Sequence, residues 1–188
     1  MKRLLLLCIP ILAAIPIFAQ DQEAQKAWMD YMTPGKIHQM LAHSNGTWTY
    51  ESTFWMAPGA PPSKSTGITE NKMILGGRYQ ESIHKGKMEG MDFEGHSLLA
   101  YDNAKKIFQN AWVDNMGTGI MMLEGTWDDA SHSLTLTGKT YDPMAGKDIE
   151  MKEVITIQDD DHHLMEMYYT GKDGKEVKSM EIHLTRKK

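Results

Sequence analysis

Cysteine is almost absent from this chain, and its absence limits how the protein can be held together. The only cysteine, Cys8, lies within the first nineteen residues. Without a second cysteine the chain forms no internal disulfide bond and contains no Cys-x-x-Cys redox or zinc motif. The Gly-x-Ser-x-Gly and His-Glu-x-x-His motifs are also missing, so the sequence carries no hydrolase or zinc-protease signature. The sequence therefore predicts a fold held by its hydrophobic core and points to no particular reaction.

A long apolar run is also lacking, except at the N terminus. There, Lys2 and Arg3 precede the apolar segment 4–18, and Ala19 is a small residue suited to precede a cleavage site. The run is short for a membrane span and two prolines interrupt it. Residues 1–19 are therefore predicted to be a cleaved secretory signal peptide. We expect an exported protein, periplasmic or secreted, with no membrane anchor after cleavage.

Positive charge is scarce in the chain that remains. Removing residues 1–19 from the 188 leaves 169 residues, and 20 − 2 = 18 basic residues then face 25 acidic ones, which changes the formal net charge from −5 to −7. Nucleic acid is a poor partner for such an acidic surface.

The length of the chain suits one domain. We expect an N-terminal extension at 20–32 and a single domain at 33–188, whose oligomeric state the sequence does not indicate.

The hydrophobic pattern changes from a helical to a strand period near residue 46. Thr33 and Pro34 are typical of an N-cap and a first helical residue, so they predict a short helix. Asn45 and Gly46 supply a left-handed stop. Within 46–54 aromatic and small residues then alternate with polar ones, which predicts a strand with one buried face.

Short segments closed by turn residues follow to the end of the chain, and they predict about ten strands. The predicted strands are 46–54, 65–75, 78–85, 92–101, 107–114, 119–127, 133–141, 148–158, 162–170 and 175–186. Short connections favour antiparallel neighbours, and closure removes exposed sheet edges. The predicted fold class is all-β: a single up-and-down antiparallel barrel with a short N-terminal helix.

Two features resemble the calycins, the group that includes lipocalins and fatty-acid-binding proteins. Gly46 and Trp48 form a Gly-x-Trp motif directly after the predicted helix, and Arg186 lies at the end of the last strand. The resemblance implies that Trp48 closes the base of a barrel and that Arg186 packs over its ring. A guanidinium group stacks well on an indole face, so the implied arrangement is physically sound.

A second resemblance covers most of the chain after the signal segment. Six motifs are similar to those of the bacterial domain-of-unknown-function family 1579. They are Thr33-Pro34-Gly35, GTW at 46–48, GGRY at 76–79, GMDFEG at 90–95, YDN at 101–103 and WVDNMGTG at 112–119. The resemblance implies an exported single-domain protein with a lipocalin-like barrel. The family has no established reaction, so it implies a fold and a compartment but no function.

The leading functional hypothesis is that a small hydrophobic ligand binds in the barrel interior. A barrel of about eight to ten strands is wide enough for one such molecule. The candidate ligand-binding residues are Tyr50, Phe54, Trp112, Asp114, Met121, Leu123, Met180 and Ile182. Asp114 would be the polar contact among them.

Two other functions stay open. A barrel-pocket enzyme would use Asp114 or Glu124, the carboxylates that flank the turn at 115–119, for acid–base work. A structural role for Asp114 is preferred, in which its carboxylate caps this turn by accepting the backbone N–H group of Met116 or Gly117. The third hypothesis is a structural or interaction barrel filled by its own side chains.

No cofactor or metal is predicted, although three sites were weighed. Fifteen methionines remain after the signal segment, since one of the 16 is Met1. They could bind copper(I), but their spread over many strands favours filling or lining the interior. His183 lies where nitrobindin barrels hold a haem-ligating histidine, yet alternation predicts that it faces solvent. The acidic stretch 159–163 is interpreted as a strand-connecting turn rather than a divalent-metal site.

Overall fold

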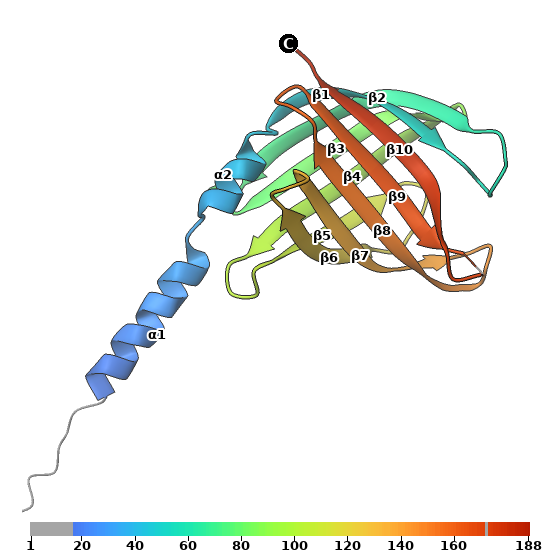
Figure 1. Cartoon of the computed structure of the whole chain (residues 1–188). Coiled ribbons are helices and arrows are strands. Elements are labelled where there is room, and N and C mark those ends of the chain that lie inside the picture. Colours follow the sequence, from blue (N-terminus) through green and yellow to red (C-terminus); the bar gives the residue numbers. More distant parts are fainter. Residues whose placement is uncertain (1–16, 172) are drawn as a thin grey trace, which may run out of the picture. The chain divides into compact units, whose positions relative to one another are not determined.

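The computed structural model describes residues 17–171 and 173–188, and within these ranges ten antiparallel strands close into one up-and-down barrel (Figure 1). Each strand pairs with its neighbours in the sequence, and the first pairs with the last. The predicted fold class is confirmed. The strands are β1 (Gly46–Phe54), β2 (Ser63–Ile74), β3 (Tyr79–Met88), β4 (Met91–Asp102), β5 (Ile107–Asp114), β6 (Met121–Asp128), β7 (Ser133–Asp142), β8 (Lys147–Ile157), β9 (His162–Thr170) and β10 (Glu176–Arg186).

Two compact units divide the chain between Thr33 and Pro34. The first contains helix α1 (Ile17–Met32), whose turns are linked on the surface by an ion pair between Lys26 and Asp30. The predicted signal segment 1–19 falls almost entirely outside the described residues. No helix in the described part of the chain has the length and apolar character needed to cross a membrane.

The second unit opens with helix α2 (Lys36–Ala42), which begins two residues later than the sequence predicts. The cap is Gly35, and its N–H donates to Nδ1 of His38 at 3.0 Å. The Thr33 hydroxyl instead donates to the carbonyl of Met29 in the preceding helix at 2.6 Å. The predicted N-cap is therefore wrong, because Thr33 closes α1 rather than opening α2.

The predicted turn at Gly86 is also wrong, because β3 continues through it to Met88. The chain reverses instead at Glu89 and Gly90, both of which have positive φ, 51° and 86°. Two consecutive positive φ angles match the twist of a tight antiparallel hairpin. Gly86 instead faces the interior of the barrel, where the Tyr50 ring leaves no room for a side chain.

Alternate connections lie at opposite ends of an up-and-down barrel. We call the end that carries α2 and the C terminus the base (Figure 1). The opposite end is the mouth. Its connections are 55–62, 89–90, 115–120, 143–146 and 171–175.

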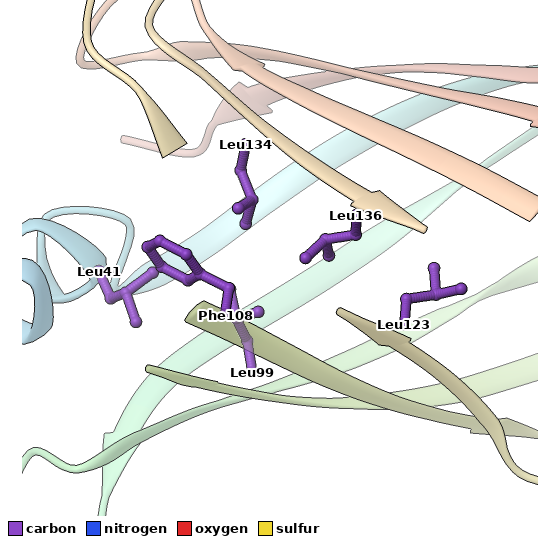
Figure 2. Close-up of a cluster of buried hydrophobic side chains, with 6 residues drawn as sticks. All are labelled: Leu41, Leu99, Phe108, Leu123, Leu134 and Leu136. Carbon is purple, nitrogen blue, oxygen red and sulfur yellow. The ribbon is translucent and has the colours of Figure 1, made fainter. Parts of the chain in front are cut away.

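Hydrophobic packing closes the base. Leu41 of α2 enters the barrel and packs among Leu99, Phe108 and Leu134, and Figure 2 shows these side chains converging while Leu136 continues the cluster toward the middle. The main chain of the helix end is also held, since the Gln80 amide donates to the Leu41 carbonyl at 2.7 Å. The base is therefore a filled core, and a ligand site must lie nearer the mouth.

Trp48 and Arg186 form the arrangement that the calycin resemblance implies. They are directly opposed on β1 and β10, and the guanidinium carbon lies 4.3 Å from the centre of the indole ring. Trp48 is completely buried (0% exposed). Arg186 also donates to the carbonyls of His43, Asn45 and Asp160 at 2.6, 2.7 and 2.9 Å. One side chain thus covers the tryptophan and joins the end of α2 to the connection between β8 and β9.

Replacing Arg186 by lysine is expected to lower the free energy of unfolding by about 2–3 kcal/mol. An ammonium group keeps the charge but cannot reach three carbonyls or stack flat on the indole. Urea unfolding followed by circular dichroism measures the loss. Arg78→Lys is the matched control, because Arg78 is exposed and donates to one carbonyl, that of Leu75. Equal stabilities for the two variants would contradict a bridging role for Arg186.

Candidate functional site

The interior above the base has two chemically different walls. Inward positions of β1 to β5 include seven polar residues, which we call the polar wall: Ser52, Ser65, Thr69, Ser82, His84, Ser97 and Asn110. Inward positions of β6 to β10 carry the methionine wall: Met121, Met151, Met165, Met167 and Met180. The interior therefore presents hydrogen-bonding groups on one side and flexible apolar groups on the other.

Most polar-wall groups are already paired with one another. Oγ1 of Thr69 lies 2.8 Å from Nδ1 of His84, and the Ser97 hydroxyl donates to Oδ1 of Asn110 at 2.6 Å. Burial, and to a smaller extent the nearby His96, lowers the pKa of His84 to about 4. His84 is therefore neutral at physiological pH, and this wall carries polarity without charge.

Solvent reaches the inward side chains along β9 and β10. Met165, Met167 and Ile182 face the interior in the body of their strands, yet each stays partly exposed. On β6 and β7, inward Leu123 and Leu136 are fully buried. The inward side chains of β9 and β10 are therefore less covered by the fold than those of β6 and β7.

All eight candidate ligand-binding residues face the interior. The strand register places Tyr50, Phe54, Met180 and Ile182 together on β1 and β10, and Trp112, Asp114, Met121 and Leu123 together on β5 and β6. Tyr50, Phe54 and Leu123 are buried and the other five are partly exposed. Their contact with a ligand stays a prediction.

Glycines create the space that the Tyr50 ring occupies. Gly67 and Gly86 are opposed on β2 and β3, and a Cβ atom added to either would lie 2.5 or 2.3 Å from the Tyr50 hydroxyl oxygen. Side chains at these two positions would therefore expel the ring. Burial raises the pKa of Tyr50, and a hydrogen bond with Ser65 opposes part of the shift. Tyr50 thus presents a neutral hydroxyl to the polar wall.

Asp114 is committed to structural hydrogen bonds at the mouth. Its Oδ1 accepts the backbone N–H of Met116 at 2.9 Å, so the predicted turn cap is confirmed. Its Oδ2 accepts the indole N–H of Trp112 at 2.6 Å. Trp112 in turn lies over Gly95, where an added Cβ would approach within 2.5 Å of the ring. Asp114 thus orients this wall residue and caps the turn, with one hydrogen bond accepted by each of its oxygens.

Glu124 does not pair with Asp114. It is opposite Gln109 on the outer face of β5 and β6, and its Oε1 accepts the Gln109 amide at 2.6 Å. Asp114 has the opposite parity and belongs to the inner face. The register therefore separates the two carboxylates that the sequence offered as an acid–base pair.

Glu153 is the inward carboxylate that the sequence analysis missed. It lies on β8, opposite Leu136 and Met167, and is 4% exposed. Its Oε1 is one of two buried side-chain oxygens in the described residues without a hydrogen-bond partner. Burial alone raises its pKa to about 7. A signal was available, because Glu153 shares the parity of Met151 and Ile155, which alternation assigns to the core.

The residues of two candidate metal and haem sites make other interactions. His183 is exposed and pairs with Glu181 at 2.9 Å, as alternation predicts. Asp159 accepts the N–H of Asp161 at 2.8 Å and contacts Nδ1 of His162, which makes the acidic stretch a capped turn. The residues of the methionine wall are spread over four strands, β6, β8, β9 and β10.

A shallow hollow of about 190 Å³ lies outside this interior, at the loop after β1. Trp55, Ala57, Pro58, Gly59 and Lys178 line it. Ligand pockets commonly measure about 300–1,000 Å³. The hollow is too small and too poor in directed polar groups to replace the interior as the candidate site.

Solved structures of distant proteins share the barrel. The crystal structure of Rv2717c from M. tuberculosis matches with a TM-score of 0.60 and 12% identity, covering 83% of this chain and 100% of that one. The structure of the S-type phycobiliprotein lyase CPES from Guillardia theta matches with a TM-score of 0.57 and 11% identity, covering 86% and 97%. At these identities the likeness shows the fold alone.

Sequence comparison places the chain in a family. No curated protein matches it. A family profile described as "Protein of unknown function (DUF1579)" matches residues 33–186, which include α2, all the strands described above and the Trp48–Arg186 base. The chain therefore belongs to the DUF1579 family, with a lipocalin-like barrel as its family domain.

Proposed function

We propose that this protein is an exported binding protein whose barrel interior holds one small, largely apolar molecule. The observation that carries the proposal is the partial exposure of inward Met165, Met167 and Ile182. Apolar side chains that face inward and still meet water gain free energy when a ligand displaces that water. The N-terminal sequence supports export, since residues 1–19 have the pattern of a secretory signal.

The chemistry of the walls suits such a ligand. Methionine is unbranched and polarisable, so it adapts to irregular apolar shapes. The polar wall supplies hydroxyl and amide groups on the side of the interior away from these methionines. Binding sites for small molecules commonly combine an apolar lining with a few directed polar groups.

The mouth carries exposed apolar side chains on three of its connections. Met56, Met116, Ile120 and Met144 are 66, 49, 67 and 79% exposed. They lie between β1 and β2, between β5 and β6, and between β7 and β8. An apolar molecule that approaches the barrel would meet these side chains before the methionine wall, so they support the mouth as the route of access.

Filling the interior tests the proposal. Met167→Trp adds bulk on the inner face of β9, and Tyr168→Trp is the matched control on its outer face, where Tyr168 lies beside Lys152. The probe is the neutral dye N-phenyl-1-naphthylamine, whose fluorescence rises in apolar surroundings. Met167→Trp is expected to weaken dye binding about tenfold or more, because the larger ring would take up volume beside the methionine wall that the dye needs. Tyr168→Trp should bind like the wild type.

Circular dichroism tests whether the two tryptophan variants are folded, and both should show the same barrel spectrum as the wild type. Native mass spectrometry of wild-type protein, purified without denaturation, is expected to show a bound small molecule that the Met167→Trp protein lacks. Failure of the dye to bind the wild type, with no copurified molecule, would overturn the proposal in favour of a filled structural barrel.

A barrel-pocket enzyme is the second candidate, and Glu153 is the observation that favours it. A buried carboxyl with a pKa near 7 is suited to proton transfer. Its opposed neighbours are Leu136 and Met167, however, so no second polar group stands beside it to share a reaction. The surroundings of Glu153 favour binding over catalysis.

A further inference from the structure

Glu153 has no polar partner in its surroundings. It projects into the barrel between Leu136 of β7 and Met167 of β9, with Met151 and Ile155 two positions away on its own strand. All four are apolar. A buried carboxyl in such surroundings loses its water and gains nothing in return, which costs free energy. The free Oε1 is therefore a hydrogen-bond acceptor that the folded chain leaves unused.

Two partly exposed residues of the methionine wall border this acceptor. Met151 and Met167, which flank Glu153, are partly exposed although they face inward. A molecule lying along the methionine wall would contact these two side chains. Its polar end could then reach the carboxyl group.

The charges of the interior favour a cation over an anion as that polar end. Lys152, next to Glu153 in sequence, has outward parity and pairs with Glu176 on the outer face. Arg186 lies at the base, where three carbonyls occupy its donors. No lysine or arginine on the strand pairs of the described barrel lies beside Glu153. An anionic ligand would meet the Glu153 carboxyl with no positive charge nearby, whereas an ammonium group would itself supply that positive charge.

We propose that Glu153 is the recognition group of the barrel and that it selects an apolar ligand carrying a protonated amine. The ammonium group would donate to the unpartnered Oε1, while the hydrocarbon part would lie along the methionine wall. This inference rests on the proposed binding function and adds the chemical class of the ligand. The raised pKa of Glu153 agrees with it, because a bound cation would favour the ionised carboxylate that burial now disfavours.

Three probes of equal chain length test the inference: decylamine, decan-1-ol and decanoic acid. Each is titrated at pH 8 into the protein loaded with N-phenyl-1-naphthylamine, and displacement of the dye gives its affinity. Wild type is expected to bind the amine about tenfold or more tightly than the alcohol or the acid, which is what one charge-assisted hydrogen bond supplies. Glu153→Gln should lose that preference and still bind the alcohol. Glu124→Gln, which removes a carboxylate from the outer face, should keep the preference.

The outcomes separate this inference from the proposed function. If the alcohol or the acid binds as tightly as the amine, or if Glu153→Gln keeps the preference, Glu153 is not the recognition group, although the barrel still binds apolar molecules. If neither the dye nor any probe binds the wild type, the binding function itself is wrong. Circular dichroism confirms that Glu153→Gln is folded before its affinities are compared.

Discussion

Replacing Trp48 by alanine should lower the free energy of unfolding by about 3–5 kcal/mol, the largest loss we expect from a single substitution. Trp48 is completely buried and lies between two partners. The Arg186 guanidinium covers the indole at 4.3 Å, and the centre of the His163 ring is also 4.3 Å away. The indole N–H donates to the Ser44 carbonyl at 2.9 Å. Alanine would leave a cavity and an uncovered charge, and the Ser44 carbonyl would keep only its hydrogen bond from the Asn71 amide.

Urea unfolding followed by circular dichroism measures the effect without relying on tryptophan fluorescence. Trp28→Ala is the matched control, because Trp28 belongs to α1 and is 61% exposed. It should change stability by less than about 0.5 kcal/mol. A small loss for Trp48→Ala would mean that the base does not depend on the tryptophan, and that the hydrophobic cluster around Leu41 closes the barrel alone.

The second large effect is a dependence of stability on pH that Glu153 imposes. Burial raises the pKa of its carboxyl from 4.5 to about 7. Between these values the folded protein binds more protons than the unfolded chain, so the free energy of unfolding falls as pH rises. Above about pH 7 the full penalty applies, which is about 3 kcal/mol at 1.36 kcal/mol per pKa unit. Glu153→Gln removes the ionisation and should remove this penalty.

The quantity to measure is the difference in free energy of unfolding between Glu153→Gln and wild type, and how it changes from low to high pH. Relative to wild type, Glu153→Gln should gain about 3 kcal/mol between pH 4.5 and pH 8.5, measured by urea unfolding. Titration of buried His84 affects both proteins and cancels in the difference. Glu150→Gln on the outer face of the same strand, where Glu150 pairs with Lys139, is the control and should show no comparable change. A constant difference across pH would show that the Glu153 carboxyl is solvated.

The strand pattern could be predicted because it depends on local chemistry. The predicted ranges 46–54, 107–114 and 162–170 coincide with β1, β5 and β9. Period-two alternation marks the buried face, and glycine and aspartate mark the turns. The same alternation placed His183 outward and the candidate lining inward. These features require no knowledge of which strands meet.

Local patterns were wrong where a distant residue determined the structure. Gly86 looks like a turn residue, but it is small because the Tyr50 ring from β1 passes over it. The carboxylates Asp114 and Glu124 look like a pair, but the register of β5 and β6 puts them on opposite faces. The first case depends on a strand far along the chain, and the second on the register of one hairpin, which turn residues alone do not determine.

The sequence by itself determined the strand pattern of the barrel and the inward parity of the candidate lining, because strand period and turn chemistry act between residues close in sequence. The Trp48–Arg186 base followed from the resemblance to the calycins. Only the tertiary structure decided that inward side chains of β9 and β10 stay partly exposed and that Oε1 of Glu153 is buried without a partner. Those properties depend on closure, which brings β7, β8 and β9 together and determines what each inward side chain meets.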